Sequence, residues 1–424
     1  MSMNADPVTR LQAAALADAS GVQRFAGGAV AVSRGRVLAV GRLSDLPVGR
    51  TIDLGDVLLT PAHVNAHTHL ELTSIGPRPY AGSFVEWVRM LQAERAAGHD
   101  AVYASVAEGC GGLADAGVGY VGDIGGGRHG QGALRGAMVD NQTQGVMFCE
   151  YLGLDGRPAE PQHERLQADL AAPAPPQGLR IGLQPHAPYS TGRGVYQACT
   201  QAAMRRGWPL STHLAEMLQE HAFVGRATGP FRDFLEDLGL WTDALLDVYG
   251  KGLSPVQWME PYLQQAPWLL AHGNYLSDDD IAILARHHAS IAYCPIASAY
   301  FGHPQNGHPP HRYRDLLAAG VNVCLGTDSI LCQPADEPQP MGVLPAMRYL
   351  HQRDGVDPAL LLAMATTHGH RALQSPALQG TLAPGADARF TLIDLPPNHG
   401  SAAVDTLTLA LQSDAPARLW DDTN

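Results

Sequence analysis

The segment "VNAHTHLELT" (64–73) places two histidines, His67 and His69, at the end of an apolar run. In an extended strand, side chains at positions i and i+2 leave the same face about 7 Å apart, so both rings can converge on one point beyond the strand end. A shared metal ion is one interpretation of this pair, and two surface histidines in a turn are the other. The pair alone does not decide between them.

Further polar residues end later apolar runs. His186 ends "RIGLQPHA", His213 and Glu216 end "PLSTHLAE", His272 follows "WLLA", and Asp328 follows "VNVCLGT". Polar groups gathered at strand ends are costly to bury unless they bind something. With the first two histidines, these residues therefore favour a functional site.

Three neutral imidazoles and one carboxylate suit zinc, and also iron(II) or manganese, with positions left open for water. We expect one divalent metal ion, zinc first, held by His67, His69, His213 and Asp328. Such a cation lowers the pKa of a bound water towards 7, and Asp328 can take that water's proton.

Three other residues have two interpretations each. Glu216 can carry a proton between water and a leaving group, or it is a first-turn carboxylate favoured by the helix dipole. His272 can polarise the attacked centre or orient the water, or it is a structural core histidine. His186 is expected to contact substrate, because four ligands already suffice for the metal.

The only lysine bears on the number of metal ions. A two-metal site bridged by a carboxylated lysine would need a lysine at the end of the fourth strand, whereas Lys251 lies in the 217–266 segment. One metal is the economical interpretation, although Glu150 could in principle bridge a second.

The elements that must position these residues alternate in type. Eight apolar runs, near 58, 117, 145, 180, 209, 268, 290 and 321, are each followed by a stretch of helical composition, such as 83–98, 194–207, 278–288 (with Ser277 as N-cap) and 312–320. This alternation predicts a (β/α)8 TIM barrel, whose active sites lie at the carboxyl ends of the strands. We place the barrel at 61–378, with 217–266 as a helical insertion that is either a lid or extra helices on the rim.

Short strands are expected at both ends of the chain. "GGAVAVSRGRVLAVGRL" and "TIDLGDVLL" have an antiparallel hairpin signature with a glycine-punctuated turn between them, and short strands reappear in 380–395.

Composition narrows the class of protein. The 424 residues carry a net charge of -13, with 28 Lys plus Arg against 41 Asp plus Glu, which disfavours a nucleic-acid partner. The first residues lack a secretory pattern and no run of eighteen apolar residues occurs, so we expect a cytoplasmic protein without a membrane partner. Six scattered cysteines without a C-x-x-C pair indicate neither a disulfide frame nor a zinc ribbon.

The motifs "NAHTHLE", "HAPYS", "HLAE", "AHGNYL", "YCPIAS" and "GTDS" occur in this order and resemble the amidohydrolase superfamily, in its cytosine-deaminase-like and chlorohydrolase-like branch. The resemblance implies a mononuclear metal enzyme that deaminates a nitrogen heterocycle at an amidine-like carbon. It also implies metal ligation by the four residues named above, proton transfer and polarisation by Glu216 and His272, and substrate contact by His186. A small β-sandwich built from both termini, 1–60 and 379–424, is implied as well. Relatives are usually dimers, so a homodimer is an open expectation.

The resemblance extends to the substrate. Glu86 and Trp87 match positions that meet a ribose in relatives, or they belong to a helix packed on the barrel. Two motifs depart from the nucleoside-deaminase pattern: "CPIASAYFGH" offers Ser298 and His303, and "GTDS" offers Ser329. The opening "NAHTHLELT... FVEWV" and the segment "YFGH" look more like the subgroup that deaminates aminodeoxyfutalosine, an adenine nucleoside of menaquinone biosynthesis.

Other functions stay open. Another amidohydrolase reaction on the same site is possible in principle: deamination of adenosine-type thionucleosides, guanine or pterins, dechlorination, or hydrolysis of a cyclic amide. A non-catalytic metal-binding barrel is the third hypothesis. Arg78, Arg312 or Arg314 are candidates for an anionic substrate tail, and the sequence does not choose among them.

Overall fold

The computed structural model describes residues 7–19, 21–23, 28–126, 131–155, 160–176, 178–334, 341–376, 379–396 and 405–421. The described residues within 1–65, 111–120 and 339–424 form one compact unit, and those within 66–110 and 121–338 form a second. Within the described ranges, no helix has both the length and the apolar character needed to cross a bilayer.

An eight-stranded sheet carries the candidate site. Its strands run in chain order: β8 (His63–Thr68), β9 (Val118–Gly125), β10 (Gln144–Tyr151), β11 (Leu179–Pro185), β12 (Leu210–Leu214), β13 (Trp268–His272), β14 (Ser290–Tyr293) and β15 (Asn322–Leu325). The registered pairs from β10 to β15 are parallel, and a parallel bridge between Thr68 and Asp328 brings the two ends of the sheet together. The predicted TIM barrel is confirmed.

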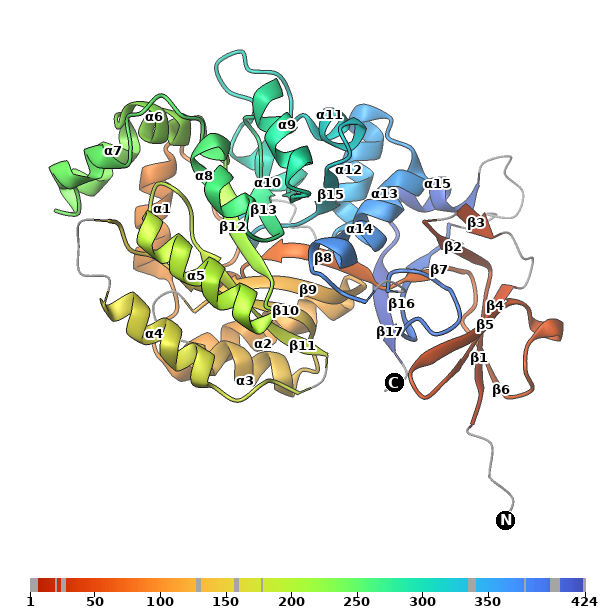
Figure 1. Cartoon of the computed structure of the whole chain (residues 1–424). Helices are drawn as coiled ribbons and strands as arrows, with labels where there is room; N and C mark the ends of the chain where they lie inside the picture. The colour runs from red at the N-terminus through yellow and green to blue at the C-terminus, as the bar shows by residue number, and fades with distance from the viewer. Residues whose placement is uncertain are drawn as a thin grey trace. The chain divides into compact units, whose positions relative to one another are not determined.

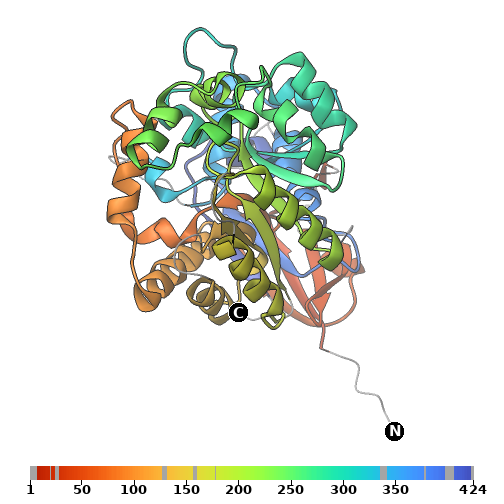
Figure 2. The ribbon, with the colours of Figure 1, turned by 60° about the vertical axis from the view of Figure 1, so that its left-hand side comes forward.

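Helices follow the strands. They are α1 (Phe84–Glu94), α2 (His99–Asp115), α3 (Gly132–Asp140), α4 (Glu160–Ala171), α5 (Arg193–Arg206), α6 (Leu218–Arg226), α7 (Pro230–Asp237), α8 (Pro255–Leu263), α9 (Asp278–Arg286), α10 (Pro295–Tyr300) and α11 (Tyr313–Ala318). Figures 1 and 2 show α4 and α5 on the outer side of β10 and β11. Ser277 caps α9 as predicted, with its hydroxyl accepting from the Asp280 N–H at 3.2 Å.

The first apolar run forms two strands instead of the single one expected. β7 (Val57–Pro61) pairs with β16 (Arg389–Asp394) and β2 (Ala15–Asp18), and the barrel strand β8 begins at His63. Pro61 has no N–H to donate, so the hydrogen-bonding ladder is easily interrupted there.

The terminal segments build two sheets with the orders β5-β4-β1-β6 and β17-β16-β7-β2-β3. The further strands are β1 (Thr9–Ala13), β3 (Gly21–Gln23), β4 (Gly28–Ser33), β5 (Arg36–Arg42), β6 (Arg50–Asp53) and β17 (Ala417–Asp421). Leu11, Val30, Leu59 and Phe390, from both sheets, share one buried core.

The N-terminal hairpin differs from the expected one. The antiparallel hairpin is β4–β5, within the first segment, whereas β6 pairs in parallel with β1. The turn between the two quoted segments is therefore not a hairpin turn. The described part of the terminal unit also contains α12 (Leu344–Asp354), α13 (Pro358–Ala365), α14 (Thr367–Ala372) and α15 (Thr406–Leu411).

The 217–266 segment is helical. It contains α6, α7, a short 3-10 helix (Asp243–Asp247) and α8. Pro230 and Pro255 stand in the first turns of α7 and α8, where a missing N–H costs nothing.

Candidate active site

The strand ends bring the predicted polar residues together. His67 lies in β8 and His69 directly follows it, His213 lies in β12, and His272 is the last residue of β13. Their rings approach closely: the His67 centroid is 5.1 Å from that of His69, 5.0 Å from that of His213 and 5.2 Å from that of His272. The histidines separated by up to about two hundred residues in the chain thus form one cluster.

The donor atoms of three histidines converge. One ring nitrogen each of His67, His69 and His213 lies within 4.8 Å of the others, and the Nε2 atoms of His69 and His213 are 3.3 Å apart. His67 is fully buried, and neither of its ring nitrogens has a hydrogen-bond partner among the described residues. Burial is the largest of the effects that lower the pKa of His67 and of His69 well below the usual value for histidine. Both rings are therefore neutral, and each keeps a nitrogen lone pair that can bind a metal.

His213 is oriented from behind. Its Nδ1 lies 2.9 Å from the carbonyl oxygen of His186, so an Nδ1–H donated there leaves the Nε2 lone pair facing His69. Metal-binding histidines in proteins are commonly held in this way. Unpartnered buried nitrogens and this orientation fit a divalent cation with nitrogen preference.

Asp328 completes the set from the eighth strand. Its Oδ1 lies 3.6 Å from the His69 Nε2 and accepts the Ser329 N–H at 2.7 Å. Its backbone N–H donates to the His67 carbonyl at 3.1 Å, which ties the residue to β8. Burial raises the pKa of Asp328 to about 6.

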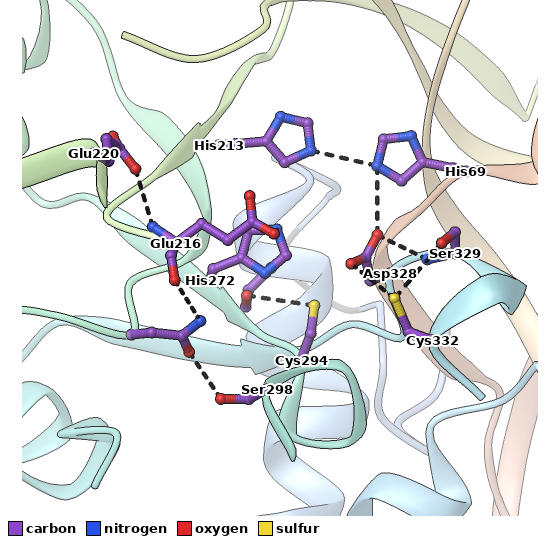
Figure 3. Close-up of polar contacts among 12 residues, drawn as sticks. His69, His213, Glu216, Glu220, His272, Cys294, Ser298, Asp328, Ser329 and Cys332 are labelled. Atoms are coloured by element: carbon purple, nitrogen blue, oxygen red, sulfur yellow. Dashed lines mark hydrogen bonds and ion pairs between the residues drawn. The ribbon is translucent and has the colours of Figure 1, made fainter. Parts of the chain in front are cut away.

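Glu216 and His272 form an adjoining group. The Glu216 Oε1 lies 3.8 Å from the His272 Nε2, and one ligand atom each of Glu216, His272 and Asp328 lies within 4.8 Å of the others (Figure 3). Burial, followed by the charges of Asp328 and Glu220, raises the pKa of Glu216 well above its usual value. A carboxyl group that holds its proton near neutral pH can serve as an acid.

A cavity of about 190 Å³ opens onto these groups. The His69, His213, Glu216, His272 and Asp328 side chains line it on the barrel side. A further part of the cavity wall is mostly apolar and comes from α1 and α7. Its residues include Phe84, Trp87, Leu91, Phe231, Phe234 and Leu235. The 217–266 segment therefore supplies part of the cavity wall.

The residues predicted to contact substrate fall into two groups. His186, Trp87 and Ser329 line the cavity. Glu86, Ser298 and His303 do not: the Glu86 carboxylate is 68% exposed and 3.4 Å from the Arg89 guanidinium. Ser298 donates to the Asn274 Oδ1 at 3.1 Å, and the His303 Nδ1 lies 2.6 Å from the Tyr275 hydroxyl.

The three candidate arginines lie elsewhere. Arg78 pairs with Glu94, Arg312 pairs with Asp278, and the Arg314 guanidinium lies 5.7 Å from the Tyr313 ring centre; none lines the cavity. Arg95, which we did not predict, does line it and pairs with the buried Glu71. It directly follows α1 as its C-cap residue, and no sequence motif identifies it.

Glu150 was considered only as a metal bridge. It lines the cavity at the end of β10, and its Oε1 lies 3.9 Å from the His186 Nε2. Beside it, the His186 Nδ1 lies 2.6 Å from the Ser190 hydroxyl. His186 is thus hydrogen-bonded through its Nδ1, and its Nε2 lies near Glu150 at the cavity edge.

Convergent imidazoles, a buried carboxylate and the adjoining Glu216 and His272 at the strand ends of a (β/α)8 barrel are the arrangement of a metal-dependent hydrolase. Residues 58–420 match the model of the amidohydrolase family, and the chain belongs to that family. It is an enzyme that hydrolyses carbon–nitrogen bonds.

Similar proteins carry related names. A 5-methylthioadenosine/S-adenosylhomocysteine deaminase of Syntrophobacter fumaroxidans is 26% identical over 389 residues, covering 89% of this chain and 82% of that protein. An aminodeoxyfutalosine deaminase of Deinococcus radiodurans is 26% identical over 326 residues, covering 74% and 73%. The fold is shared with an adenosine deaminase of Xanthomonas campestris solved with bound zinc (TM-score 0.72, 18% identity, 97% and 91% covered).

Proposed function

We propose that this chain is a metal-dependent hydrolytic deaminase of an aminated purine-type nucleoside, with aminodeoxyfutalosine as its specific substrate. The observation that carries the proposal is the meeting of Glu216 and His272 with the potential ligands His69, His213 and Asp328 in one cavity. The names of the relatives support the nucleoside class.

The proposed ligands are His67, His69, His213 and Asp328, around one divalent cation, with zinc favoured by three imidazoles and one carboxylate. When bound, such a cation polarises a water molecule and lowers its pKa towards 7. The imidazoles of His67 and His69 are predominantly neutral, which suits metal binding, because a protonated ring has no lone pair to offer.

The protein's own groups move the protons. Water adds to the carbon that carries the amino group, and Asp328 accepts the proton that the water loses. Glu216, whose raised pKa keeps it protonated, donates to the neighbouring ring nitrogen. His272 stabilises the oxygen that develops at the attacked carbon. Return of the proton from Asp328 to the amino group lets ammonia leave as the carbon–nitrogen bond breaks. Glu216, now a carboxylate, takes the hydroxyl proton of the adduct, which leaves a carbonyl on the ring and restores the protonated Glu216.

A second candidate substrate class comes from the relatives. Several deaminases of 5-methylthioadenosine and S-adenosylhomocysteine match most of this chain at 26–28% identity. The apolar wall of α1 and α7 suits a nucleoside with an apolar arm, such as a thioether, as well as one with an aryl group. Aminodeoxyfutalosine would place the enzyme in menaquinone biosynthesis, and the thionucleosides would not.

A substrate screen tests the proposal. Purified protein is analysed for metal and assayed for ammonia release with aminodeoxyfutalosine, 5-methylthioadenosine, S-adenosylhomocysteine, adenosine, guanine and pterins. The highest kcat/KM is expected for aminodeoxyfutalosine. A higher kcat/KM for a thionucleoside would make that compound the specific substrate in place of aminodeoxyfutalosine. Metal-loaded protein that deaminates no nucleoside would overturn the proposed function.

A further inference from the structure

Glu220 is a buried carboxyl group that the proposed chemistry does not use. It is the third residue of α6, is 0% exposed, and does not line the cavity. A carboxyl group without solvent is expensive to retain unless its hydrogen bonds serve some purpose.

The contacts of Glu220 are with the backbone that carries Glu216. Its Oε2 accepts the N–H of Glu216 at 3.1 Å, and hydrogen bonds from the N–H groups of Ala215 and Glu216 act on its pKa (Figure 3). A glutamate at this helix position usually reaches the N-cap residue. Here the N-cap is Met217, and Glu220 reaches one and two residues beyond it.

That backbone has an unfavourable conformation. Ala215 has φ +50°, in the left-handed region, which costs energy for any residue with a Cβ. The turn nevertheless has to hold this shape, because it directs the Glu216 side chain from the end of β12 towards His272. Strained backbone persists only where surrounding contacts fix it.

The other side of the same peptide segment is also held. The Glu216 carbonyl accepts from the Asn274 Nδ2 at 3.0 Å, and the Ala215 carbonyl accepts from the Tyr275 N–H at 3.2 Å. Asn274 is in turn fixed by the Ser298 hydroxyl at 3.1 Å. The segment is clamped between Glu220 on its N–H side and the 274–275 loop on its carbonyl side.

We propose that Glu220 is a positioning residue for catalysis: by holding the Ala215 and Glu216 N–H groups it aims the Glu216 carboxyl at the reacting ring. This role rests on the proposed function. Positioning matters because a displacement of about 1 Å at a reacting group can cost about 100-fold in rate.

The protonation of Glu220 is consistent with this role. Burial raises its pKa to about 8, and its Oε1 has no hydrogen-bond partner within the described ranges. A neutral carboxyl still accepts the Glu216 N–H through its Oε2. Glutamine reproduces that state, whereas alanine removes the acceptor.

The experiment compares Glu220→Ala and Glu220→Gln with wild type in two measurements on the metal-loaded protein. For Glu220→Ala we expect kcat to fall between about 10-fold and 100-fold, with KM within about twofold and metal content unchanged. The Glu220→Gln variant should retain most of kcat. Hydrogen exchange of the Ala215 and Glu216 amides should accelerate at least about tenfold in the alanine variant only.

Asp280→Ala is the matched control, because Asp280 is also a buried third-position carboxylate that accepts a backbone N–H, that of Ser277, at the start of α9. It should lower the melting temperature and leave kcat unchanged. Unchanged exchange in Glu220→Ala overturns the positioning, and accelerated exchange with wild-type kcat overturns its link to catalysis. If wild type deaminates no nucleoside, the proposed function fails, while hydrogen exchange still tests the contact.

Discussion

At the scale of single residues, the site combines burial with unusual backbone. Asp328 and His272 adopt left-handed conformations with φ +61° and +73°, and both are at most 5% exposed. Such conformations are uncommon for residues other than glycine and concentrate at functional sites. They turn the two side chains away from the strand direction, His272 towards the His67 ring and Asp328 towards the His69 ring.

Glu216→Gln separates an enzyme from a metal-binding barrel. Glutamine keeps the size of the side chain and removes the transferable proton, so kcat should fall by about 10²–10⁴-fold. Metal content, measured by elemental analysis, should equal that of wild type. Glu236→Gln, on the exposed face of α7, is the control and should be fully active. Wild-type turnover in Glu216→Gln would remove Glu216 from the mechanism.

Asp123 gives a prediction on pH. Its Oδ1 accepts the Leu70 N–H at 2.8 Å, and burial raises its pKa to about 8. Between the unfolded value, about 3.9, and 8, the folded protein binds more of this proton than the unfolded chain, so the free energy of unfolding falls as pH rises.

Asn does not titrate, so in Asp123→Asn the free energy of unfolding should fall less steeply with pH, by at most about 1.4 kcal/mol per pH unit. Urea unfolding of wild type and variant between pH 5 and about 8 measures the difference. The exposed Asp247→Asn should keep the wild-type slope, and parallel curves for Asp123→Asn and wild type would contradict the assignment.

At the scale of elements, two helices decide what the cavity admits. Phe231 of α7 stacks on Tyr189 with ring centres 4.1 Å apart and meets Phe84 of α1 edge-on at 5.9 Å. The Arg89 guanidinium of α1 donates to Asp237 at 2.8 Å, which joins the two helices at their exposed side. The insertion thus acts as a wall of the cavity.

Phe231→Leu should weaken substrate binding, and Phe231→Ala should weaken it further. Loss of an aromatic contact of about 1.4 kcal/mol raises KM about tenfold, with a smaller effect on kcat. Steady-state kinetics on the best substrate measure both. Leu238→Ala, just beyond α7 and 44% exposed, should have no effect; an unchanged KM in both Phe231 variants would exclude α7 from substrate binding.

At the scale of the whole molecule, metal binding couples to stability. The ligand atoms come from β8, β12 and the residues after β15, which are distant in the chain, so the unfolded chain cannot offer the same site. A ligand that binds only the folded state stabilises it by about 3–4 kcal/mol at 100 to 1,000 times its dissociation constant.

Removal of the metal by a chelator should lower the melting temperature by several degrees and abolish activity, and added zinc should restore both. Differential scanning calorimetry and the ammonia assay measure the two effects. His213→Ala should lose the response to chelator. Full activity in protein shown by elemental analysis to contain no divalent ion would overturn the metal requirement.

The sequence by itself determined the strand ends and their polar residues. Apolar runs alternating with helical stretches identify the eight strands, and His67, His69, His213, His272 and Asp328 stand out because polar side chains end runs that are otherwise apolar. Ser277 was identifiable as an N-cap because capping depends on local hydrogen bonds. These are short-range signals.

Only the tertiary structure decided the rest. Whether Glu86 or Arg95 faces the cavity depends on how α1 is rotated against the barrel, and an amphipathic helix does not fix that angle by itself. Glu220 was invisible as a positioning residue because its partners are backbone N–H groups, which every residue but proline has. The division of the first run into β7 and β8 depended on which sheet offered a partner, and strand pairing is decided between segments far apart in the chain.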